Sequence, residues 1–118
     1  MEAPINSTPW HDIAETYRSL VENDWDMQSM LSLVEEISAS RYADGVFATT
    51  SMATLCVAQT PVFELNRNML RVDFEGGRFV FNYRESPLKD SSWKKECGRD
   101  EGFRTFEHVV GRLKWFLN

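Results

Sequence analysis

The side chains best suited to chemistry in this sequence are two cysteines and two histidines, and all four are isolated along the chain. They are His11, Cys56, Cys97 and His108. A structural zinc site uses four such ligands, usually arranged as two close pairs. The sequence contains no such pairs, so we expect neither a metal site nor a cofactor.

One pair remains as a candidate for thiol chemistry, namely Cys97 with His108. Cys97 lies in a polar stretch beside Lys94 and Lys95, whose positive charge would favour the thiolate. A thiol enzyme also needs an oxyanion hole and a group that orients the base, and the sequence shows neither. Cys56 falls in an apolar stretch and is expected to be an inert core thiol. A reactive thiol at Cys97 is therefore a minor alternative.

Short catalytic and phosphate-binding motifs are absent from the sequence. It contains no glycine-rich nucleotide loop, zinc-protease pattern, nucleophile elbow or calcium loop. The neighbouring carboxylates Glu35-Glu36 fall at the polar edge of a predicted helix and are expected to be solvated. These absences favour a non-enzymatic protein.

The last predicted helix, from about Gly102 to Leu117, carries the strongest candidate for a binding surface. Its apolar stripe is Phe103, Phe106, Val109, Val110, Leu113, Phe116 and Leu117. At 100° per residue, the opposite arc carries Arg104, His108, Gly111 and Trp115. Interfaces are enriched in Trp and Arg, and Gly111 allows close approach. We predict that this arc binds a partner, together with Trp93; the alternative is that the preceding loop folds back through Trp93 and covers it.

Two helical segments are predicted at the start of the chain, with Thr8 as N-cap and Pro9 as the first helical residue. Their apolar stripes are Trp10, Ile13, Ala14, Tyr17, Leu20 and Val21, then Met27, Met30, Leu31, Val34 and Ile37. Asn23-Asp24 interrupts the pattern, and Asp24 is expected to cap the second helix. We favour two helices over one bent helix across residues 9–40.

The surest local feature is a β-hairpin from Leu70 to Tyr83, closed on Gly76-Gly77, where both residues can take positive φ. Counting outward from the turn pairs Glu75 with Arg78, Phe74 with Phe79, Val72 with Phe81 and Leu70 with Tyr83. This register gathers the apolar pairs on one face of the sheet. Two earlier strands are expected between Val46 and Thr60, where a turn near Ser51-Met52 would pair Phe47 with Cys56.

Length and charge narrow the class of protein. With 118 residues, 1–118 is expected to be one domain, with 1–7 frayed and 84–101 as a long loop. The net charge of −5 makes nucleic acid an unlikely partner. Residues 1–60 hold nine acidic and two basic side chains, so a basic partner is one interpretation of this half and a solvated helix face the other.

The sequence also indicates the cellular compartment of the protein. No apolar run approaches the roughly 20 residues that span a bilayer, and no secretory signal opens the sequence. We therefore expect a cytoplasmic protein with free thiols and no membrane partner.

Taken together, these patterns predict an α+β fold: two N-terminal helical segments, a four-stranded antiparallel meander and a C-terminal helix packed on one sheet face. The favoured function is protein binding without catalysis, as in an adaptor, an immunity-type inhibitor or a dedicated chaperone. The partner would be another protein or a second copy of the chain. The alternative is a small-ligand binder or minor thiol-dependent enzyme with a pocket between sheet and helices.

Overall fold

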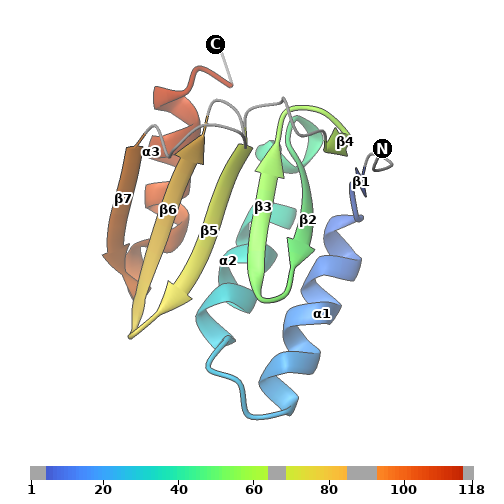
Figure 1. Cartoon of the computed structure of the whole chain (residues 1–118), viewed down its shortest axis with the longest axis vertical. Helices are drawn as coiled ribbons and strands as arrows, with labels where there is room; N and C mark the ends of the chain where they lie inside the picture. The colour runs from blue at the N-terminus through green and yellow to red at the C-terminus, as the bar shows by residue number, and fades with distance from the viewer. Residues whose placement is uncertain (1–4, 64–68, 85–92, 116–118) are drawn as a thin grey trace.

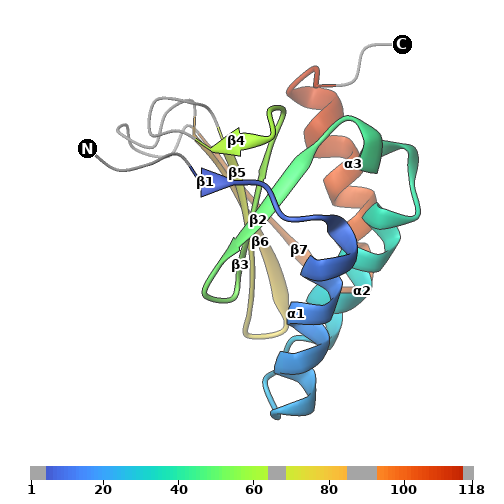
Figure 2. The ribbon, with the colours of Figure 1, turned by 90° about the vertical axis from the view of Figure 1, so that its right-hand side faces the viewer.

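The computed structural model describes residues 5–63, 69–84 and 93–115. The chain folds as an α+β domain in two layers, with the helices together on one face of an antiparallel sheet (Figures 1 and 2). The helices are α1 (Trp10–Glu22), α2 (Gln28–Ser38) and α3 (Gly102–Arg112), with short 3-10 turns η1 (Arg41–Asp44) and η2 (Arg99–Glu101). The predicted fold class is therefore confirmed.

The main sheet is a five-stranded antiparallel meander in the order β2-β3-β5-β6-β7. Its strands are β2 (Phe47–Ser51), β3 (Thr54–Ala58), β5 (Met69–Glu75), β6 (Arg78–Arg84) and β7 (Trp93–Gly98). A separate two-stranded sheet joins β1 (Ile5–Asn6) to β4 (Val62–Phe63) on the side of the main sheet away from the helices (Figure 2). The expectation that residues 1–7 fray thus does not hold for Ile5–Asn6.

The predicted hairpin register is confirmed pair by pair. Leu70 pairs with Tyr83, Val72 with Phe81, Phe74 with Phe79 and Glu75 with Arg78. Gly76 and Gly77 have φ of 58° and 78°, as the turn chemistry requires.

Two strand predictions need correction. In β2 and β3, Thr49 rather than Phe47 pairs with Cys56, because the turn falls one residue later, at Met52-Ala53. The sequence analysis also missed a strand: residues 93–98, predicted as loop, form β7 and pair with β6. Its sequence WKKECG lacks the alternating apolar pattern of a half-buried strand, because β7 lies at the edge of the sheet. Residues 85–92 of the predicted loop lie outside the described residues.

Residues 10–38 form two separate helices, as predicted, and the two helices make an antiparallel hairpin (Figure 1). Asp24 does not cap α2: it has φ of 67° and ends α1 instead. The Trp25 amide donates to the Leu20 carbonyl at 3.0 Å, and the Asp24 amide donates to Val21 at 3.1 Å. These two hydrogen bonds define a Schellman motif, which reverses the chain direction between the helices.

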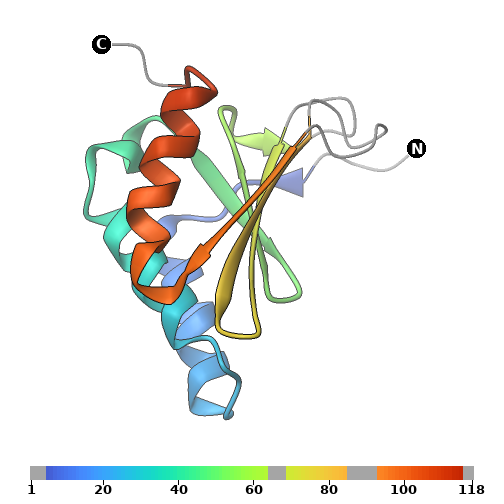
Figure 3. The ribbon, with the colours of Figure 1, turned by 90° about the vertical axis from the view of Figure 1, so that its left-hand side faces the viewer.

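The core lies between the helices and the inner face of the sheet, and it is rich in aromatic rings. Its largest fully buried side chains include Tyr17, Phe79, Phe81 and Phe106. The Tyr17 hydroxyl donates a hydrogen bond to the Ala53 carbonyl at 3.0 Å, which joins α1 to the β2–β3 turn. Figure 3 shows α3 lying beside α2 on this face.

Candidate functional site

Three of the predicted partner-binding residues share the solvent-exposed side of α3. Arg104, His108 and Gly111 are all exposed. Trp93 begins β7 opposite Tyr83, and its side chain lies outside the described part of the structure. The structure thus brings three of the predicted residues together on α3.

The predicted position of Trp115 on this exposed arc is wrong. The helix ends at Arg112, and Lys114 takes a φ of 60°. The Trp115 amide then donates to the Val110 carbonyl at 3.1 Å, which forms a second Schellman motif. This reversal turns the indole inward, where it is 9% exposed and meets the Tyr83 ring edge-on at 6.4 Å. The helical-wheel argument failed because it extended the helix beyond its end.

The premise for a reactive Cys97 is also wrong. Cys97 lies in β7, opposite Phe79, and is 6% exposed within the core. His108 is exposed on α3, and no hydrogen bond joins the two side chains in the described structure. Lys94 lies on the other face of β7, and Lys95 is exposed although it shares the face of Cys97. The thiol itself is buried, so it does not lie in the polar loop that the sequence suggested.

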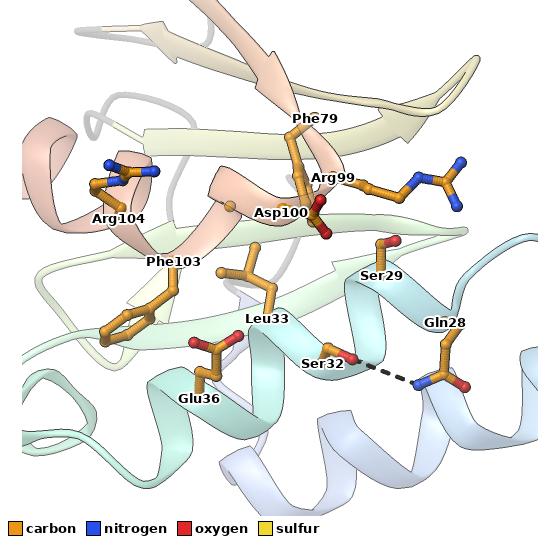
Figure 4. Close-up of a pocket in the computed structure, with 11 residues that line it drawn as sticks. Gln28, Ser29, Ser32, Leu33, Glu36, Phe79, Arg99, Asp100, Phe103 and Arg104 are labelled. Carbon is orange, nitrogen blue, oxygen red and sulfur yellow. Dashed lines mark hydrogen bonds between the residues drawn. The ribbon is translucent and has the colours of Figure 1, made fainter.

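A groove of about 430 Å³ separates α2 from the η2–α3 segment (Figure 4). Its lining is Gln28, Ser29, Ser32, Leu33, Glu36, Phe79, Arg99, Asp100, Gly102, Phe103 and Arg104. Buried Leu33 and Phe79 and half-buried Phe103 supply its apolar part, and the exposed side chains form a charged rim. Of the predicted binding residues whose side chains the structure describes, Arg104 alone lines this groove.

Small residues explain why the groove exists. On α2, Ser29 points its short side chain towards the opposite wall, and Ser32, whose Oγ accepts a hydrogen bond from Gln28, is equally small (Figure 4). On that wall, Gly102 rests directly on the Phe79 ring, because a Cβ at Gly102 would lie only 2.6 Å from Phe79 Cε2. The backbone of α3 therefore approaches the sheet closely at its first residue, while the serines leave space above it.

The groove is lined by polar groups of several kinds around its apolar floor. Its lining includes two hydroxyls, two carboxylates and two guanidinium groups, but no histidine, cysteine or lysine. Arg104 makes only an exposed ion pair with Glu101, at 3.9 Å, and such a pair contributes little to stability. Its guanidinium is consequently accessible to a partner's carboxylate.

A second cavity, of about 240 Å³, lies on the opposite face of the sheet. Its lining is Thr49, Thr50, Ser51, Cys56, Phe63, Met69 and Arg71. Burial raises the pKa of the Cys56 thiol, and the positive charge of Arg71 offsets this only in part. The prediction of an inert Cys56 is consistent with this environment, although the residue borders a cavity on the outer sheet face and does not belong to the main core.

Sequence reasoning missed the two most exposed large hydrophobic side chains in the described structure. Trp25, in the α1–α2 turn, is 52% exposed, and Met52, in the β2–β3 turn, is 92% exposed. The available signal was that Trp25 belongs to neither helical stripe and stands between Asp24 and Asp26. An apolar residue outside both stripes and next to a turn is a candidate for exposure.

Two further classes of site receive no support in the described part of the chain. None of its helices has the length and apolar character needed to cross a membrane. Among the same residues, no three His, Cys, Asp or Glu side chains gather closely enough to hold a metal ion.

Comparison of the chain with protein-family models, with curated proteins and with solved structures finds no significant match.

Proposed function

We propose that this chain is a non-enzymatic protein-binding domain, which holds a partner segment in the α2–α3 groove and against the exposed side of α3. The groove carries the proposal, because it combines an apolar floor with an exposed rim of both charges. Protein interfaces share this arrangement of apolar centre and polar rim. The two unpaired cysteines suit a reducing compartment, so we place the protein in the cytoplasm.

The rim explains how the groove would select a partner. Arg99 and Arg104 stand on the η2–α3 side together with Asp100, whereas Glu36 stands on α2 (Figure 4). The η2–α3 side of the lining is therefore net positive and the α2 side negative, so a partner segment with an acidic residue towards α3 and a basic residue towards α2 would complement both sides. Charge complementarity of this kind acts on association rate and specificity more than on affinity.

Filling the groove tests the proposal. Ser32→Arg places a long side chain in the groove, and Ser19→Arg makes the same change on exposed α1, outside it. Each tagged variant is used to capture partners from the source cells, with quantification by mass spectrometry. We expect Ser32→Arg to lose at least tenfold of a partner that wild type and Ser19→Arg retain, an effect of about 1.4 kcal/mol.

Two controls complete the experiment. Circular dichroism and thermal unfolding must show that Ser32→Arg is folded. Light scattering decides whether the occupant is a second copy, because a dimer that Ser32→Arg dissociates would identify the partner as the chain itself. Equal capture by both variants would exclude the groove as the docking surface.

A small-ligand binder is the second candidate, and the cavity on the outer sheet face favours it. Arg71 borders this cavity, and no described side chain forms an ion pair with it. The guanidinium is therefore available to a small carboxylate beside the apolar Phe63 and Met69. A panel of carboxylic acids should raise the melting temperature of wild type but not of Arg71→Met; absence of any shift would remove this candidate.

A further inference from the structure

The α1–α2 turn presents an indole that the fold does not use for packing. Two Schellman motifs occur in the described part of the chain, and each places a tryptophan at the same position: Trp25 after α1 and Trp115 after α3. Trp115 is 9% exposed and packs on Tyr83, whereas Trp25 is 52% exposed. Because the local backbone is the same in both, the exposure of Trp25 is a property of its surroundings and not of the motif.

Acidic side chains without ion-pair partners surround this indole in sequence. Glu22, Asp24 and Asp26 are exposed, and none forms an ion pair with a described residue. The one basic residue of the two helices, Arg18, is already paired with Glu15 and Glu35. The turn therefore combines an aromatic face with uncompensated negative charge.

The position of the turn makes it accessible. In Figures 1, 2 and 3 the α1–α2 turn projects beyond the ends of the strands, at the end of the molecule opposite β1 and β4. The β2–β3 turn, which carries Met52, lies at the same end. Gln28, three residues after Trp25, begins α2 and lines the groove. A segment held in the groove thus reaches the turn at that end.

We propose that Trp25, with Glu22, Asp24 and Asp26, binds a lysine or arginine side chain of a basic protein segment. A cation over the indole face gains a cation–π interaction, for which Trp is the best ring. The flanking carboxylates attract the same cation and orient it. Charge complementarity commits this surface to a basic partner, whereas a second copy of this acidic chain is opposed by the same charges. This inference rests on the proposed protein-binding function and names the chemistry of the partner.

The test uses the full chain and a synthetic lysine- and arginine-rich peptide, with a peptide of the same pattern in glutamate as the matched control. The indole N–H signal of Trp25, assigned in the NMR spectrum by its loss in Trp25→Phe, reports binding directly. We expect the basic peptide to shift this signal and the acidic peptide to leave it in place. Raising the ionic strength to about 0.15 M should weaken binding, because exposed charges are screened there.

Two substitutions separate the ring from the charges. Trp25→Ala should lower the affinity for the basic peptide about 3- to 10-fold, because the cation–π interaction is lost. Glu22→Gln with Asp26→Asn should lower it at least about threefold, whereas Asp12→Asn with Asp44→Asn removes the same charge elsewhere on the exposed surface. The second pair should leave affinity within a factor of about two.

Several outcomes would overturn the inference. They are unchanged affinity in Trp25→Ala, equal losses in the two charge pairs, or no shift of the Trp25 signal with the basic peptide. A dimer that Trp25→Ala dissociates would also overturn it, because the occupant would then be a second copy. Failure of the proposed function is seen separately, as equal capture by Ser32→Arg and Ser19→Arg, an experiment that uses no peptide.

Discussion

Substitution by alanine should change the free energy of unfolding in opposite directions at the two glycines of α3. Gly102 and Gly111 lie in one helix with ordinary helical backbone, so alanine gains up to about 1 kcal/mol of helix propensity at an interior position. Their surroundings differ. A Cβ at Gly111 meets nothing within 4 Å, whereas one at Gly102 lies 2.6 Å from the buried ring of Phe79.

At Gly102 the clash of the new methyl group with Phe79 should outweigh the gain in helix propensity, so Gly102→Ala should destabilise the protein. Overpacking a well-packed core costs about 1 to 3 kcal/mol, and Gly102 gains little propensity because it is the first residue of the helix. We expect Gly102→Ala to lower the free energy of unfolding by about 1 to 2 kcal/mol. Gly111→Ala should raise it by about 0.5 to 1 kcal/mol. At about 4 °C per kcal/mol for a domain of this size, the two melting temperatures should move apart measurably.

Urea unfolding of the three proteins gives these free energies, and a double-mutant cycle identifies the cause. Phe79→Leu removes the ring atoms that the new methyl group would meet. In that background, the cost of Gly102→Ala should shrink by about 1 kcal/mol, because the two sites are in contact. A Gly102→Ala protein as stable as wild type, or a cost unchanged by Phe79→Leu, would refute the close approach of α3 to the sheet.

Three further outcomes follow from the buried side chains. Trp115→Ala should lower the free energy of unfolding by about 3 kcal/mol, since the indole is buried; a loss below about 0.5 kcal/mol would restore the surface position. Burial raises the pKa of Tyr17, so as the pH rises to about 10 and above the unfolded state loses this proton first and the free energy of unfolding falls. Urea unfolding should show a smaller fall between pH 8 and about pH 10.5 in Tyr17→Phe than in wild type. An equal fall in both proteins would contradict the burial of Tyr17. Both cysteines are buried, so a thiol reagent should label neither quickly in native protein and both in denaturant; one fast native thiol would contradict their placement.

The parts of the fold set by short-range chemistry could be predicted from the sequence. Gly76-Gly77 fixed both the turn and the register of β5 with β6, because a two-residue turn leaves one pairing that keeps the apolar residues together. The helical hairpin followed in the same way from two stripes and an interruption at Asn23-Asp24. In each case the determining residues lie within a few positions of one another.

The parts that depend on long-range contacts could not be predicted. β7 is a strand because β6 offers it hydrogen bonds, and its own residues do not encode an apolar face. The end of α3 depended on Lys114, a residue type that rarely takes positive φ, so Trp115 was placed on the wrong side. The candidate groove lies between segments far apart in the chain, and only Arg104 of its lining was named in advance as a binding residue.

The two edges of the main sheet have a consequence for aggregation. Along β2, the Thr8 amide donates to the Ala48 carbonyl at 2.8 Å, so the N-terminal segment occupies part of that edge. Along β7, Lys95 falls on the same face as the core residue Phe81 and is nevertheless exposed. An inward-pointing lysine on an edge strand opposes edge-to-edge pairing of sheets, since a docking strand would have to bury its charge. The polar sequence of β7, which kept it from being predicted as a strand, therefore also protects this edge of the sheet from pairing with the sheet of another molecule.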